Sequence, residues 1–99
     1  MSNNLFIIHI TYTAPIEKID THLVEHRSYL DQCYTDGHYL VSGPQIPRTG
    51  GIIIAQGTSE SDIHNLMKKD PFSIHGLIEY DITQFDAVKS IDSIKKWLK

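Results

Sequence analysis

The chain has 99 residues, a formal net charge of −3, 21% charged residues and 40% hydrophobic residues, as expected for one small globular domain. Its mild acidity excludes the basic footprint of a nucleic-acid-binding protein, and no apolar run is long enough to cross a membrane. The single cysteine, Cys33, excludes an internal disulfide and a multi-cysteine zinc site. Six histidines are the unusual feature of the composition: His9, His22, His26, His38, His64 and His75.

The first half of the chain predicts two strands and a long helix. Residues 5–12 are rich in isoleucine, which is typical of a strand, and both faces of that strand are apolar, so we expect protein on both sides of it. Apolar residues recur at helical spacing over residues 16–36, and Gly37 is placed to end that helix. A short second strand is predicted over residues 38–43, before a loop over 44–51 that is rich in proline and glycine.

The second half predicts two further strands and two helices. Residues 51–57 form a third strand, and Ser59 lies in a capping-box position before a helix that Pro71 ends or restarts as a turn. Residues 77–85 alternate between apolar and polar side chains, which predicts a fourth strand. Residues 90–98 have the spacing of a short amphipathic helix.

This order of elements predicts a single α+β domain over residues 1–99 with the ferredoxin-like βαββαβ arrangement. Two helices cover one face of a four-stranded antiparallel sheet, and a C-terminal helix with Ser90 as its N-cap follows. The opposite, apolar face of the sheet stays bare in a monomer, and such a face marks an interface. We therefore expect a homodimer or a higher homo-oligomer in which two sheets pack face to face.

His26 and Asp70 are the candidate catalytic residues. His26 lies on the inner face of its predicted helix beside Cys33, and an imidazole there suits proton transfer near neutral pH. The alternative is a core histidine that bonds a backbone carbonyl. Asp70 projects from the inner face of its own helix, although a residue before Pro71 also suits an N-cap role. A carboxylate that accepts one imidazole N–H would leave the other nitrogen free to act as a base.

The end of the second strand supplies candidate substrate-binding residues. Ser42 offers a hydroxyl group, Gly43 allows close approach of a backbone, and Pro44 follows in the same turn. Arg48 in the next loop could hold an anionic substrate. The alternatives are a plain turn and a solvated arginine.

A metal site is not expected from the sequence. His22 and His26 have the i, i+4 spacing of a metal-binding pair, but no motif supplies a third ligand. The other histidines are interpreted as incidental, and Cys33 as a small core residue. We expect no cofactor. The segment Met1–Asn4 lacks the basic residues of a secretory signal, so we expect a cytoplasmic protein.

The chain resembles the YciI-like (YCII-related) domain family over residues 5–86. The resemblance is carried, in order, by His26–Leu30, Ser42–Pro44, Pro47–Gly51, Lys69–Phe72 and Gly76–Tyr80. It implies a dimeric α+β barrel, similar to muconolactone isomerase-type proteins. It also implies that His26 and Asp70 occupy the positions of a histidine–aspartate dyad proposed to be catalytic. Most members have no established substrate, and at least one relative acts by elimination on a chlorinated hydroxylated aromatic. Residues 89–99 lie outside the resemblance.

Two functions fit these residues. The first is a cofactor-independent lyase or isomerase that acts on a small cyclic or aromatic oxygenated molecule, with His26 moving a proton and Asp70 orienting it. The second is a non-catalytic module that binds a small ligand or serves as an accessory subunit, in which His26 and Asp70 form a structural pair. An open pocket that reaches His26 favours catalysis or ligand binding, whereas a filled core around it favours a structural pair.

Overall fold

The computed structural model describes residues 4–98, so Met1–Asn3 and Lys99, which belong to the predicted domain, lie outside the described residues. Four strands form one antiparallel sheet: β1 (Asn4–Tyr12), β2 (Tyr39–Pro44), β3 (Gly50–Gln56) and β4 (Ile78–Asp86). Their order across the sheet is β2-β3-β1-β4, which is the ferredoxin-like arrangement. The predicted α+β fold is confirmed.

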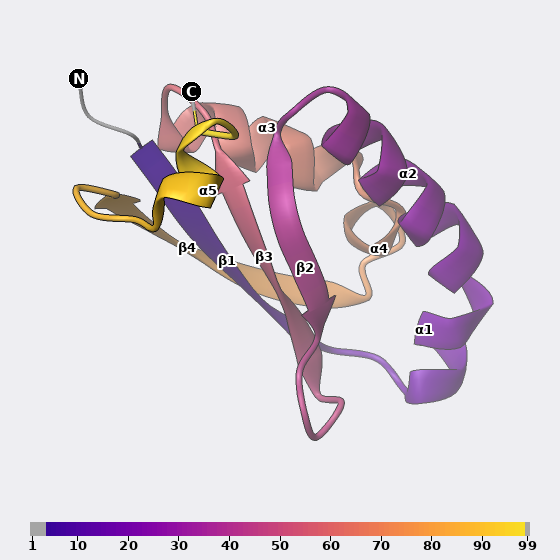
Figure 1. The fold of residues 1–99 in the computed structure, drawn as a ribbon. Helices are drawn as coiled ribbons and strands as arrows, with labels where there is room; N and C mark the ends of the chain where they lie inside the picture. Colours follow the sequence, from indigo (N-terminus) through magenta and orange to yellow (C-terminus); the bar gives the residue numbers. More distant parts are fainter. Residues whose placement is uncertain (1–3, 99) are drawn as a thin grey trace.

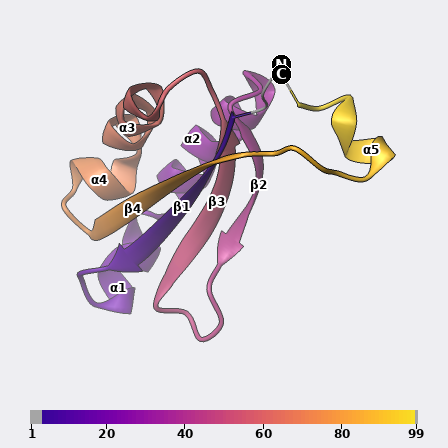
Figure 2. The same ribbon diagram turned by 90° about the vertical axis from the view of Figure 1, so that its left-hand side faces the viewer.

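Helices cover one face of this sheet. They are α1 (Ile16–Thr21), α2 (Leu23–Thr35), α3 (Glu60–Lys69) and α4 (Pro71–Ile74) (Figure 1). The last helix, α5 (Asp92–Lys95), lies on the opposite side of the sheet, as the view along the sheet shows (Figure 2). No helix within residues 4–98 has the length and the apolar character needed to span a membrane.

The single helix predicted over residues 16–36 is wrong, because the backbone breaks at His22. This residue has φ −106° and ψ 9°, outside the α-helical region, and its N–H donates to the carbonyl of Ile19. The hydroxyl of Thr21 donates to the carbonyl of Glu17 at 2.8 Å, which satisfies part of the end of α1. No glycine or proline lies at the break, and the helical spacing of the apolar residues continues across it. The sequence therefore carries no signal for the break.

The core lies between the sheet and the helices. Every second residue of β1 points toward the helices, and Ile8 pairs there with Ile53 on one side and Ile82 on the other. The main buried cluster draws on β1, β2, β3, α2 and α3: Phe6, Ile8, Ile10, Cys33, Tyr39, Ile53, Ala55, Ile63 and Met67. A smaller cluster unites α1 with α4 and the residue that precedes β4: Ile19, Phe72 and Leu77. Leu23 of α2 packs against this smaller cluster, which holds α2 next to α4.

The other face of the sheet carries exposed apolar side chains, as expected. Val41 is 56% exposed, and Ile52 and Phe85 are each 40% exposed. Strand register places these residues on the face away from α1 to α4, because Val41 pairs with Ile54 and Ile52 pairs with His9. The helices of the chain therefore leave part of this face uncovered.

The C-terminal helix is shorter than the predicted span of 90–98. Only Asp92–Lys95 is helical, its N-cap residue is Ile91 rather than Ser90, and no side chain caps it. The segment touches the sheet where Gln56 Nε2 donates to the carbonyl of Trp97 at 3.0 Å. A short helix gains its stability from packing, and Trp97 is largely exposed here. The helical pattern of the sequence therefore extends over only one turn.

Candidate functional site

The junction between α3 and α4 places the carboxylate of Asp70. The backbone of Asp70 is extended, with φ −65° and ψ 130°, and Pro71 opens α4. Asp70 Oδ1 accepts a hydrogen bond from the backbone N–H of Phe72 at 2.9 Å. Because proline at the first helical position has no N–H to satisfy and the aspartate caps the next donor, the Asp-Pro-Phe sequence fixes this carboxylate locally.

His26 meets that carboxylate from α2. Its Nδ1 lies 2.8 Å from Asp70 Oδ1, and the two side chains are 11% and 0% exposed. The second oxygen, Asp70 Oδ2, is buried and has no hydrogen-bond partner among residues 4–98. The structure thus brings together the two residues that the sequence placed on inner helix faces, and Asp70 serves as a helix cap at the same time.

Phe72 fixes the plane of the imidazole. Its ring stacks on His26 with centroids 3.8 Å apart and 7° between the planes, and Phe72 is itself buried against Ile19 and Leu77. The same short segment therefore supplies the hydrogen-bond acceptor of His26 and the surface on which its ring lies. Two constraints in different directions leave the ring one orientation.

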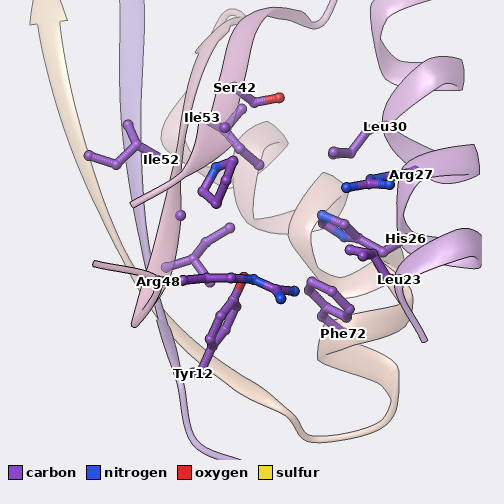
Figure 3. A pocket seen from close by; sticks show the side chains of 14 residues that line it. Tyr12, Leu23, His26, Arg27, Leu30, Ser42, Arg48, Ile52, Ile53 and Phe72 are labelled. Carbon is purple, nitrogen blue, oxygen red and sulfur yellow. The ribbon is translucent and has the colours of Figure 1, made fainter. Parts of the chain in front are cut away.

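A pocket of about 440 Å³ opens beside His26, between α2 and the β2–β3 hairpin (Figure 3). This volume suits a small organic molecule. Since Nδ1 of His26 is bonded to Asp70, its other nitrogen, Nε2, is the one left for the pocket, and it has no hydrogen-bond partner among the described residues. Much of the wall is apolar, with Ile10, Leu23 and Leu30 among the residues that form it.

All four predicted substrate-binding residues, Ser42, Gly43, Pro44 and Arg48, line this pocket. The hydroxyl of Ser42 shares a hydrogen bond with the hydroxyl of Tyr34. A side chain added at Gly43 would meet no atom within 4 Å, so this position borders open space.

Arg48 is held at the pocket by α1 and β1. Its Nη2 donates to Asp20 Oδ1 at 2.7 Å, and its guanidinium carbon lies 5.9 Å from the centre of the Tyr12 ring. The hydrogen bond to Asp20, with a smaller effect of Tyr12, raises the pKa of Arg48, so the side chain is a permanent cation. A guanidinium has five N–H donors, which leaves donors beyond the bond to Asp20.

The hairpin that carries these residues depends on Gly50. A Cβ at this position would lie 1.8 Å from the carbonyl oxygen of Ile10, so only glycine fits where β3 meets β1. Pro44 at the end of β2 and Arg48 in the turn before Gly50 are thereby held beside the pocket.

Tyr12 and Phe72 are site residues that the sequence reasoning missed. Tyr12 ends the helix-facing side of β1 and lines the pocket, and Phe72 supports His26 from below. A signal was present for Phe72, because it follows the Asp70-Pro71 pair directly. The only sequence signal for Tyr12 is its place at the end of a strand, and this place does not distinguish a site residue from a core residue.

The pocket does not offer a set of metal ligands. His26 is the one imidazole that lines it, and the described residues that line it include no carboxylate. The two histidines with i, i+4 spacing bind different partners. His26 bonds to Asp70, whereas His22 Nδ1 bonds to Glu25.

Comparisons with known proteins agree with this fold. The YCII-related domain matches residues 5–86, and comparison with curated proteins found no match. Among solved structures, the chain is similar to 5-chloro-2-hydroxyhydroquinone dehydrochlorinase from Burkholderia phenoliruptrix in complex with 2,5-dihydroxybenzoquinone. The identity is 21% with a TM-score of 0.72, over 82% of this chain and 92% of that one. Since the domain match covers most of the sequence, the chain belongs to the YCII-related domain family.

Proposed function

We propose that the protein is a cofactor-independent enzyme of the lyase or isomerase type that moves a proton on a small cyclic or aromatic oxygenated substrate. The observation that carries this proposal is a buried His26–Asp70 pair whose imidazole borders an open pocket of about 440 Å³. A histidine with a purely structural role would more simply be enclosed by the core. Because Asp70 lies buried behind His26, the proposal gives the two residues different roles.

In this proposal His26 Nε2 is the group that exchanges the proton. Asp70 Oδ1 accepts the Nδ1 hydrogen at 2.8 Å, which selects the tautomer with a lone pair on Nε2. When Nε2 takes a proton from a hydroxyl or a carbon acid of the substrate, the adjacent carboxylate stabilises the imidazolium that forms. The electron pair left on the substrate either expels an anionic leaving group or accepts the proton back at a second carbon.

The pocket favours a flat substrate with an oxygen substituent. Its apolar wall suits the faces of a ring, whereas Ser42 and Arg48 offer hydrogen-bond donors at its border. The cationic guanidinium of Arg48 would stabilise a phenolate or enolate oxygen. The dehydrochlorinase with the same fold acts on a chlorinated hydroxyhydroquinone and was solved with a dihydroxybenzoquinone, and both molecules are flat oxygenated rings.

We further propose that two copies of the chain pair through their open sheet faces. The exposed side chains of Val41, Ile52 and Phe85 lie on that face, and burial of apolar area stabilises association. Val41→Asp should then convert a dimer to a monomer in sedimentation experiments. A wild-type protein that is monomeric at micromolar concentration would contradict this assembly. The cytoplasmic location stays a prediction.

The substrate class can be found by a thermal-shift screen of hydroxylated aromatics, lactones and enols. A compound that binds the folded state raises the melting temperature, and compounds that occupy the pocket should lose much of this effect in Arg48→Ala. Each compound that binds is then tested for turnover by the wild type and by His26→Ala.

Turnover by the wild type that is lost in His26→Ala, with ligand binding retained, is the expected result. Ligand binding without turnover of any compound would favour the non-catalytic binding module. Full turnover in His26→Ala would contradict the role given to His26.

A further inference from the structure

A second cluster of histidine and carboxylate side chains lies outside the pocket. His22 stands at the break between α1 and α2, Glu25 is in the first turn of α2, and His75 caps the end of α4. The side chains are 26%, 49% and 41% exposed, respectively. The proposed reaction uses none of them.

The three side chains lie close together around Glu25 Oε1. His22 Nδ1 bonds to Glu25 Oε1, His75 Nε2 lies 3.3 Å from the same oxygen, and the two imidazoles stack with centroids 3.8 Å apart. One atom of each side chain lies within 4.8 Å of one atom of each of the others. Two imidazoles and a carboxylate therefore present their ligand atoms in one small volume at the surface.

One of these separations matches the distance between two ligands of a tetrahedral metal ion. Zinc binds imidazole nitrogen and carboxylate oxygen at about 2.0–2.2 Å, so two ligands of a tetrahedral site are about 3.3 Å apart. The separation of His75 Nε2 from Glu25 Oε1 is 3.3 Å.

We propose that His22, Glu25 and His75 form a binding site for a divalent transition metal such as zinc, with water completing the coordination. Such a metal would join the start of α2 to the end of α4. These are the two helices that hold His26 and Asp70 together, so the site would act as a clamp beside the proposed catalytic pair. It would be a structural site, separate from the cofactor-independent reaction, and its existence does not depend on that reaction.

Calorimetric titration of chelator-treated, tag-free protein with zinc chloride tests the site. We expect one zinc ion per chain, a higher melting temperature in the presence of zinc, and the intense visible bands of tetrahedral coordination when cobalt replaces zinc. His75→Ala and Glu25→Gln should each weaken zinc binding at least about tenfold, because each removes one of three ligands.

His64→Ala is the matched control. His64 Nε2 lies 3.9 Å from Glu60 Oε1 on α3, so it is a surface histidine beside one carboxylate with no second imidazole, and its loss should leave zinc affinity unchanged. Circular dichroism checks that each variant is folded, and Glu25→Gln keeps the size of the side chain if His75→Ala unfolds. Equal zinc affinity in wild type, Glu25→Gln and His75→Ala, or a cobalt complex without tetrahedral bands, would overturn the proposal.

Discussion

Two clusters of histidine and carboxylate lie one helical turn apart on α2, and each joins that helix to one end of α4. At the start of α4, the buried pair His26–Asp70 borders a pocket. At its end, His22 and Glu25 meet His75 near the surface. The residue types are the same, and the two clusters share their secondary-structure elements, so the difference in their chemistry comes from burial and from the number of partners.

The buried surroundings of His26 give its ring a single orientation. Asp70 holds one nitrogen and Phe72 holds the ring plane, so the remaining nitrogen has a fixed orientation toward the pocket. The exposed cluster has two imidazoles around one carboxylate that solvent reaches, and exposed ion pairs contribute little to stability. One site is therefore suited to exchange a proton at a defined position, and the other to collect a ligand from solution.

The largest expected effect is a difference in turnover between variants of the two clusters. His26→Gln should lower turnover of a substrate found in the screen by about 10²–10⁴-fold, the usual contribution of a general acid–base group. His75→Gln should lower it far less, because His75 does not line the pocket. Steady-state kinetics of both variants and of the control His64→Gln make the comparison. Equal losses in His26→Gln and His75→Gln would erase the distinction.

The next effect separates the two roles of Asp70. Asp70→Asn keeps an oxygen that can cap α4 but loses the charge beside His26, so kcat should fall while the fold survives. Asp70→Ala should also lower the free energy of unfolding, by about 1 kcal/mol for the lost cap and about 1–3 kcal/mol for the unpaired His26 N–H. Urea unfolding and kinetics measure both quantities. An Asp70→Asn variant with wild-type kcat would limit Asp70 to a structural role.

The smallest effect concerns Glu25 and acid. The hydrogen bond from His22 lowers the pKa of Glu25 from its ordinary value of 4.5. Its contribution to stability is therefore present above about pH 4.5 and is lost as the pH falls through the lower, folded-state pKa. The stability difference between wild type and Glu25→Gln in urea unfolding should shrink between neutral pH and pH 3. A difference that grows on acidification would contradict this assignment.

Much of the fold could be predicted because its signals are local. The Ser59 cap appears as predicted, with its hydroxyl accepting from the N–H of Asp62 at 3.2 Å, and Asp70 caps the turn that Pro71 opens. The break at His22 could not be predicted, since it leaves the apolar spacing of α1 and α2 intact. The length of α5 could not be predicted either, because it depends on how much surface the segment buries.

The site was partly predictable for a similar reason. Helical spacing places His26 and Asp70 on inner faces, and the family resemblance pairs them. Their contact also needs α2 and α4 to lie side by side, which the packing of Leu23 from α2 against the cluster of Ile19, Phe72 and Leu77 provides. The meeting of His75 with Glu25 depends on the same packing between residues distant in sequence, and no spacing rule in the sequence signals it.

The central claim is that Asp70 holds His26 so that Nε2 faces the pocket as a base. The ¹⁵N spectrum of the His26 imidazole at pH 8 tests it directly, with a pocket ligand from the screen added in a second spectrum. We predict a proton on Nδ1 and a bare Nε2 whose signal shifts when the ligand binds, with the Nδ1 signal changed in Asp70→Asn. A proton on Nε2 with a bare Nδ1, or an Nε2 signal that the ligand leaves unchanged, would contradict the account.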